Sequence, residues 1–176
     1  MSETESSGAR GWPRSTAIVG AGTMGLGVAE SFAVAGSTGV RLTDATPEAT
    51  REAYERPMQR TRGHAEAGLL GAESVDRAAA IETADDISAA VRGADLVFEA
   101  VPEDLDLKHE ILAACADAAP PEAVIVSNTS SLPIDELANS VERPERFLGM
   151  HWFNPPEWTP GVEVIPALAT DPEVVE

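Results

Sequence analysis

Residues 20–25 read Gly-Ala-Gly-Thr-Met-Gly, which is the spacing G-x-G-x-x-G of a dinucleotide-binding turn. The glycines serve different purposes: Gly20 permits a tight bend, Gly22 lets the backbone approach a pyrophosphate, and Gly25 lets a helix pack close to a strand. A pyrophosphate bound there lies on a helix N-terminus, where free N–H groups and the helix dipole favour negative charge. Thr23 and Met24 complete the turn and are expected cofactor contacts.

Asp44 ends the next apolar run, 24 residues after Gly20. A carboxylate at that point accepts hydrogen bonds from the ribose hydroxyls of adenosine and repels a 2′-phosphate. Residues 45–47 contain no arginine that could accommodate such a phosphate. The predicted cofactor is therefore NAD rather than NADP; the alternative is a glycine-rich turn beside an unrelated aspartate.

His151 and Glu163 are the pair best suited to acid–base chemistry. His151 lies near the end of a predicted strand, and Glu163 follows twelve residues later on the next strand-like run. Oxidation of an alcohol needs a base for the hydroxyl proton while hydride leaves the same carbon. A histidine can take that proton near neutral pH, and a carboxylate on its other ring nitrogen fixes the tautomer. The alternative is a structural histidine with satisfied hydrogen bonds.

Short β-rich runs that alternate with helix-like segments must position these residues, and this alternation is typical of a parallel sheet. Thr46 and Pro47 supply an N-cap and a first helical residue. Strands are predicted at 15–20, 39–44, 78–82, 94–101, 123–127, 147–152 and 162–165. Helices are predicted from the glycine turn to about 35, at 47–61 with a continuation to about 70, and at 87–92, 104–118 and 133–140. The predicted fold is α/β, a Rossmann-type doubly wound and mostly parallel sheet in a single domain, whose ligands lie beyond the carboxyl ends of the strands.

The strongly acidic composition excludes some classes of binding partner. The net charge of -18 over 176 residues, with Lys108 as the sole lysine, argues against nucleic acid and anionic membranes as partners. No run of 18 apolar residues is present, and the single cysteine, Cys115, fits an apolar filler in a cytoplasmic protein. Residues 1–13 are predicted to be a flexible leader and residues 14–176 the folded domain. The arginines at 51, 56, 60 and 62 are interpreted as a solvated helix face.

Residues 15–166 resemble the 3-hydroxyacyl-CoA dehydrogenase family. The resemblance rests on the glycine turn and on four further segments, in the family's order and with close spacing. These segments are Val-Phe-Glu-Ala-Val-Pro-Glu at 97–103, Ser-Asn-Thr-Ser-Ser-Leu at 127–132, Gly-Met-His-Trp-Phe-Asn-Pro-Pro at 149–156 and Val-Glu-Val-Ile at 162–165.

The resemblance implies roles for these residues. It makes His151 the base and Glu163 its orienting partner, and it places Ser130 on the substrate oxygen and Asn154 near the nicotinamide. Cofactor contacts follow for the matching residues Ala100, Glu103, Lys108 and Asn128. Two alternatives stay open: Ser130 caps the helix that follows Pro133, and Lys108 is a surface helix lysine.

The implied reaction is NAD-dependent interconversion of a 3-hydroxyacyl thioester and its 3-oxoacyl form, with a place in fatty acid metabolism. The sequence departs from the family pattern in two ways, one that concerns the substrate and one that concerns the helical domain. Residues 51–70 contain no lysine for CoA, so another acyl carrier or a free 3-hydroxy acid is an alternative substrate. Residues 166–176 leave no room for the family's helical domain, so we expect a partner helical domain or self-association. A non-catalytic NAD-binding sensor or interaction module is the rival function.

Overall fold

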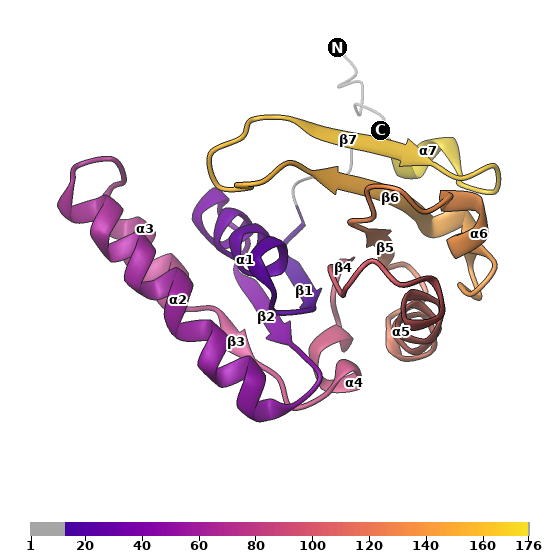
Figure 1. The fold of residues 1–176 in the computed structure, drawn as a ribbon, viewed down its shortest axis with the longest axis horizontal. Coiled ribbons are helices and arrows are strands. Elements are labelled where there is room, and N and C mark those ends of the chain that lie inside the picture. The colour runs from indigo at the N-terminus through magenta and orange to yellow at the C-terminus, as the bar shows by residue number, and fades with distance from the viewer. Residues whose placement is uncertain (1–12, 176) are drawn as a thin grey trace, which may run out of the picture.

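The structure, a computed structural model, describes residues 13–175, so the predicted leader lies almost entirely outside the described residues. Within that range one seven-stranded sheet has the order β3-β2-β1-β4-β5-β6-β7 (Figure 1). Neighbouring strands from β3 to β6 pair in parallel and only β7 is antiparallel. The strands are β1 (Ser15–Val19), β2 (Gly39–Thr43), β3 (Glu82–Thr83), β4 (Leu96–Glu99), β5 (Val124–Ser127), β6 (Phe147–Trp152) and β7 (Val162–Pro166).

Helices cover the two faces of this sheet, with α1 to α3 on one side and α5 and α6 on the other (Figure 1). The helices are α1 (Thr23–Ala35), α2 (Pro47–Glu66), α3 (Ala72–Ala79), α4 (Ile87–Val91), α5 (Leu105–Ala118), α6 (Ile134–Ala138) and α7 (Pro172–Val175), with a 3-10 turn, η1, at Pro144–Arg146. The predicted α/β, doubly wound and mostly parallel sheet is therefore confirmed.

Side-chain alternation along the strands separates two cores. In β1, Ala17 and Val19 face the core under α4 to α6, whereas Ile18 faces the core under α1 and α2. In β4, Val97 joins the first core and Phe98 the second. Each inner strand is thus buried on both faces, which explains its near-continuous apolar sequence. Cys115 fills the first core, where burial raises the pKa of its thiol to about 12, in agreement with the interpretation as an apolar filler.

Local capping explains where the helices begin. Thr46 Oγ1 accepts a hydrogen bond from Ala49 N at 3.1 Å, and Pro47 occupies the first helical turn of α2, as predicted. Asp104 Oδ1 caps α5 by accepting from Leu107 N at 2.9 Å. Each cap satisfies a backbone N–H group that the first turn of the helix would otherwise leave without a partner.

The predicted strand at 78–82 is wrong in its position. Helix α3 occupies Ala72–Ala79, and β3 is a two-residue strand at Glu82–Thr83. The alanines at 78–80 have a strong helix propensity, and Ser74 and Ala78 are buried on one side of α3. Among the described residues, no helix is both long enough and apolar enough to cross a membrane.

Candidate active site

The turn between β1 and α1 has the close approaches that its glycines permit. Gly20 has a φ of +108°, and its N–H donates to Thr43 O at 2.9 Å. A Cβ at Gly20 would lie 2.6 Å from Ala100 O, and a Cβ at Gly25 would lie 1.8 Å from Gly20 O. Gly22 differs, because a Cβ there would have no neighbour within 4 Å. The open side of Gly22 is the space that a bound pyrophosphate would need.

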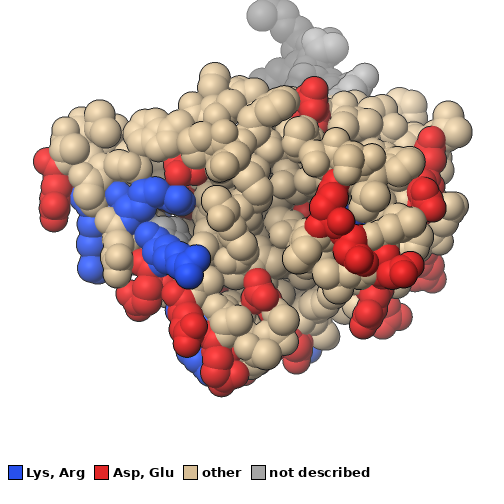
Figure 2. All heavy atoms as spheres, in the orientation of Figure 1, with Lys and Arg blue, Asp and Glu red and all other residues tan. Residues whose placement is uncertain are grey.

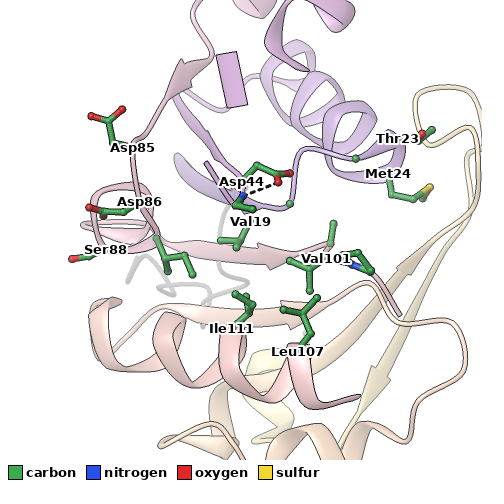
Figure 3. A pocket seen from close by; sticks show the side chains of 16 residues that line it. Val19, Thr23, Met24, Asp44, Asp85, Asp86, Ser88, Val101, Leu107 and Ile111 are labelled. Atoms are coloured by element: carbon green, nitrogen blue, oxygen red, sulfur yellow. Dashed lines mark hydrogen bonds between the residues drawn. The ribbon is translucent and has the colours of Figure 1, made fainter. Parts of the chain in front are cut away.

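A cleft of about 880 Å³ runs past this turn at the carboxyl ends of the strands. Figure 3 shows Leu107 and Ile111 pointing from α5 toward Val101 and Val19, with Thr23 and Met24 at the opposite end from Asp85. The cleft is mostly apolar at its centre, with backbone of the glycine turn on one wall. This combination suits an adenosine diphosphate, whose ring needs apolar walls and whose phosphates need N–H donors.

Asp44 lies where this cleft meets the end of β2. Its Oδ2 accepts from Ala21 N at 2.5 Å and its Oδ1 from Ala45 N at 2.7 Å. Each carboxylate oxygen can accept two hydrogen bonds, so the side chain retains capacity for ribose hydroxyls. Among the residues that the structure describes, no arginine lines the cleft. The geometry is therefore suited to an unphosphorylated adenosine ribose.

A smaller hollow of about 300 Å³ adjoins the cleft, and Met24, Ala100 and Val101 line both. His151 lines this hollow, and its Nδ1 lies 2.8 Å from Glu163 Oε2. The histidine side chain is 19% exposed and the glutamate 58%. Because Nδ1 is engaged by the carboxylate, Nε2 is the ring nitrogen available to a substrate proton. The rest of the hollow is lined by Glu103, Asn128, Ser130, Trp152, Phe153 and Asn154.

Glu103 holds the serine loop that follows β5. Its Oε1 accepts from Thr129 Oγ1 at 2.6 Å and from the N–H groups of Ser130 and Ser131 at 2.9 Å each. Burial alone would raise the pKa of this carboxyl, but these hydrogen bonds outweigh it and lower the pKa to about 2. An ionised Glu103 thus fixes the backbone that presents the Ser130 hydroxyl to the hollow.

Ser130 is not a helix cap. Its Oγ lies 3.4 Å from Glu103 Oε1, and α6 begins at Ile134 without any side-chain cap. The capping alternative is therefore wrong. The side chain of Asn128 is also engaged, because its Oδ1 accepts from Trp152 N at 2.9 Å and so joins the ends of β5 and β6.

Lys108 lies beneath the hollow and does not line it. Its side chain is 1% exposed, and its Nζ lies 2.7 Å from Glu99 Oε1 and 3.6 Å from Glu103 Oε2. Glu99 Oε2 accepts from Ser127 Oγ at 2.5 Å, so each charge in this buried group has a partner. The alternative of a surface lysine is wrong. The structure gives Lys108 a place between two carboxylates, one of which holds the serine loop.

The sequence did not single out the far wall of the large cleft, formed by Asp85, Asp86, Ile87 and Ser88 at the start of α4. These residues follow β3 directly, and ligands collect beyond the carboxyl ends of parallel strands. The predicted strand at 78–82 ends too early in the chain, so the sequence does not show that residues 85–88 follow the end of β3. Within residues 13–175, no group of three His, Cys, Asp or Glu side chains is arranged to hold a metal ion.

Comparison with known proteins identifies this arrangement. Residues 15–176 match the family described as 3-hydroxyacyl-CoA dehydrogenase, NAD binding domain. The chain belongs to the 3-hydroxyacyl-CoA dehydrogenase family. The matched unit is the NAD-binding domain, and the open side of Gly22, the Asp44 carboxylate and the apolar cleft fit that cofactor.

Individual relatives agree with this assignment. The chain is 39% identical to 3-hydroxyadipyl-CoA dehydrogenase of Escherichia coli K12, over 93% of this chain and 34% of that protein. It is 36% identical to 5-formyl-3-hydroxy-2-methylpyridine 4-carboxylate 5-dehydrogenase of Mesorhizobium japonicum, over 92% and 52%. The crystal structure of 3-hydroxybutyryl-CoA dehydrogenase from Escherichia coli superposes with a TM-score of 0.87 at 38% identity, over 93% and 34%. The chain thus spans about a third to about half the length of these relatives.

Proposed function

We propose that this chain forms the cofactor and acid–base half of an NAD-dependent dehydrogenase that interconverts a 3-hydroxyacyl thioester and its 3-oxoacyl form. The observation that carries the proposal is the contact of 2.8 Å between His151 Nδ1 and Glu163 Oε2, in a hollow that adjoins the cleft beside the glycine turn. This contact supports the proposal because it holds one tautomer of His151 in a hollow next to the expected cofactor cleft.

The residues divide the work as follows. NAD supplies the acceptor for the hydride that leaves the substrate carbon. Nε2 of His151 takes the hydroxyl proton, while Glu163 stabilises the imidazolium that forms. Ser130 and Asn154 provide short polar groups for the oxygen as its charge develops. In the reverse direction, protonated His151 returns the proton to that oxygen.

The acyl carrier is proposed to be CoA, as the names of the Escherichia coli relatives indicate. A free hydroxy acid is a second candidate, favoured by two observations. The Mesorhizobium japonicum relative is named for a pyridine carboxylate rather than a CoA ester, and α2 carries arginine but no lysine. Figure 2 shows the basic side chains gathered on the left of this face, over the region of α2, while acidic side chains are spread more widely. Both candidates use the same acid–base chemistry.

We also propose that another folded unit covers β7. All five residues of β7 are exposed, with Val162 at 38%, Val164 at 46% and Ile165 at 38%. This unit is either a helical domain from the remainder of a longer protein or a second copy of the chain. A cytoplasmic location is proposed from the single, buried cysteine, which fits a reducing compartment.

The experiment is oxidation of NADH with acetoacetyl-CoA by the 176-residue chain, with His151→Ala as the control. Turnover that disappears in the variant supports the dehydrogenase. NADH binding without turnover, for acetoacetyl-CoA and for free acetoacetate, and also after addition of a helical partner domain from a relative, would contradict it. That result would favour the rival function, a non-catalytic NAD-binding module.

A further inference from the structure

The loop between β6 and β7, residues 153–161, joins the two strands that carry His151 and Glu163, and Asn154 lies within it. Its start borders the small hollow, where Phe153 packs against the His151 ring with 4.9 Å between ring centroids. Within the loop, Trp158 N and Thr159 N both donate to Pro155 O, at 3.2 and 3.0 Å. The loop is therefore a folded turn, and anything that moves it moves the edge of the hollow.

A group of paired charges, of which Arg60 is 30% exposed, contacts the middle of this loop. Glu30, on α1, has a side chain that is 4% exposed, and it accepts hydrogen bonds from Arg60 Nε at 2.8 Å and from Thr61 Oγ1 at 2.6 Å. The same guanidinium reaches Glu157 Oε1 with Nη1 at 3.0 Å. Arg60 thus joins a buried carboxylate of α1 to a carboxylate of the loop. The predicted solvated face of α2 holds for Arg51, Arg56 and Arg62, which are exposed, but not for Arg60.

Close packing also holds this loop against α1 and α2, independently of the charges. Pro156 is buried, and a Cβ at Gly27 of α1 would lie 2.4 Å from Pro156 Cγ. Trp158 contacts the ring of His64 on α2 edge to face, with 4.8 Å between centroids. Pro156, Glu157 and Trp158 of one short loop therefore each approach α1 or α2.

We propose that Arg60 is a positioning residue that seats loop 153–161 on α1 and α2 and so holds Phe153 and Asn154 at the nicotinamide end of the cofactor cleft. Planar guanidinium geometry suits this task, because one side chain must bind two carboxylates at once. The adenosine end of the cleft has no residue from this loop in its walls. Loss of the Arg60 contacts should therefore weaken binding of the nicotinamide half of the cofactor and leave binding of the adenosine half unchanged. The expected effect on NADH binding rests on the proposed function, whereas the role of Arg60 in holding loop 153–161 does not.

Two measurements on the 176-residue chain test it. The first compares the affinities for NADH and for ADP-ribose, which lacks the nicotinamide. The second follows hydrogen exchange of the Trp158 and Thr159 amides without ligand. Arg60→Gln and Gly27→Ala should each weaken NADH binding by about tenfold or more, which corresponds to about 1.4 kcal/mol of lost contacts with the nicotinamide half. Both should leave ADP-ribose affinity unchanged and speed exchange at both amides. Arg60→Lys, which keeps the charge but can bind fewer carboxylate oxygens, should lose less NADH affinity than Arg60→Gln.

Matched controls are available on α2. Arg62→Gln removes an exposed positive charge two residues away, and Gly63→Ala adds a Cβ with no neighbour within 4 Å. Both should behave as wild type. Equal loss of NADH and ADP-ribose binding in Arg60→Gln would show a general structural role and overturn the proposal, as would unchanged exchange at the two amides. If wild type binds neither ligand, the proposed function fails, and the exchange measurement still decides whether Arg60 seats the loop.

Discussion

His151 and Glu163 face each other directly across the antiparallel strands β6 and β7, and their side chains meet at 2.8 Å. Directly opposed residues in such a pair share one face of the sheet, so the register of β7 decides whether the contact exists. A slip by one residue would turn Glu163 to the other face and bring an apolar neighbour toward the histidine. The register of this hairpin therefore determines whether the proposed base has its carboxylate partner.

Removal of either partner should lower turnover more than cofactor binding. We expect His151→Gln to reduce kcat by between about 10²- and 10⁴-fold, the usual contribution of a positioned acid–base group. Glu163→Gln should also reduce kcat, because a neutral amide stabilises imidazolium less well. NADH affinity, measured by fluorescence titration, should fall far less than kcat, because glutamine keeps a polar side chain at both positions and leaves the contact of Arg60 with loop 153–161 unchanged. Equal losses in kcat and in NADH affinity would contradict these roles.

The features that could be predicted from the sequence are those that a short motif or the pattern of a single segment specifies. The cap at Thr46 depends on a neighbour three residues away, and the glycine turn and Asp44 were found from the glycine spacing and from the end of an apolar run. The burial of Lys108 depends instead on Glu99 of another element. Its sequence context on α5 does not reveal that partner, and the same holds for Arg60 and Glu157. Charge pairs between different elements that no sequence motif marks were therefore the part that the sequence could not supply.

Asp44 should determine the choice between NADH and NADPH. Its carboxylate lies at the cleft wall with both oxygens already bonded to backbone N–H groups, so it is fixed in place. A 2′-phosphate would meet this negative charge, and such a juxtaposition disfavours binding by about 10²-fold or more. Asp44→Ser should bring the two affinities to within about tenfold. Asp85→Asn removes an equal charge from the same cleft and should leave the ratio unchanged; a ratio unaltered in Asp44→Ser would disprove the assignment.

Two glycines of the turn should respond in opposite ways to the same substitution. Gly25→Ala places a Cβ 1.8 Å from Gly20 O, so we expect the free energy of unfolding to fall by about 3 kcal/mol or more. Gly22→Ala meets nothing within 4 Å and should leave stability near wild type. Its Cβ would occupy the space needed by the pyrophosphate, so NADH affinity should fall. Urea unfolding and NADH titration of both variants check this; normal NADH binding by Gly22→Ala would mean that the cofactor lies elsewhere.

Glu103 should make stability depend on pH in the acid range. The hydrogen bonds from the serine loop lower the pKa of its carboxyl from 4.5 to about 2. The unfolded chain therefore binds more protons between these values, and the stability that Glu103 contributes is complete above pH 4.5 and is lost as pH falls toward about 2. We expect Glu103→Gln to be less stable than wild type at pH 7 and to show a weaker decline across this window. Glu110→Gln, an exposed change on α5, is the control, because its unfolding curve should remain parallel to wild type at every pH. Parallel curves for Glu103→Gln as well would show that the carboxyl is not held ionised by the loop.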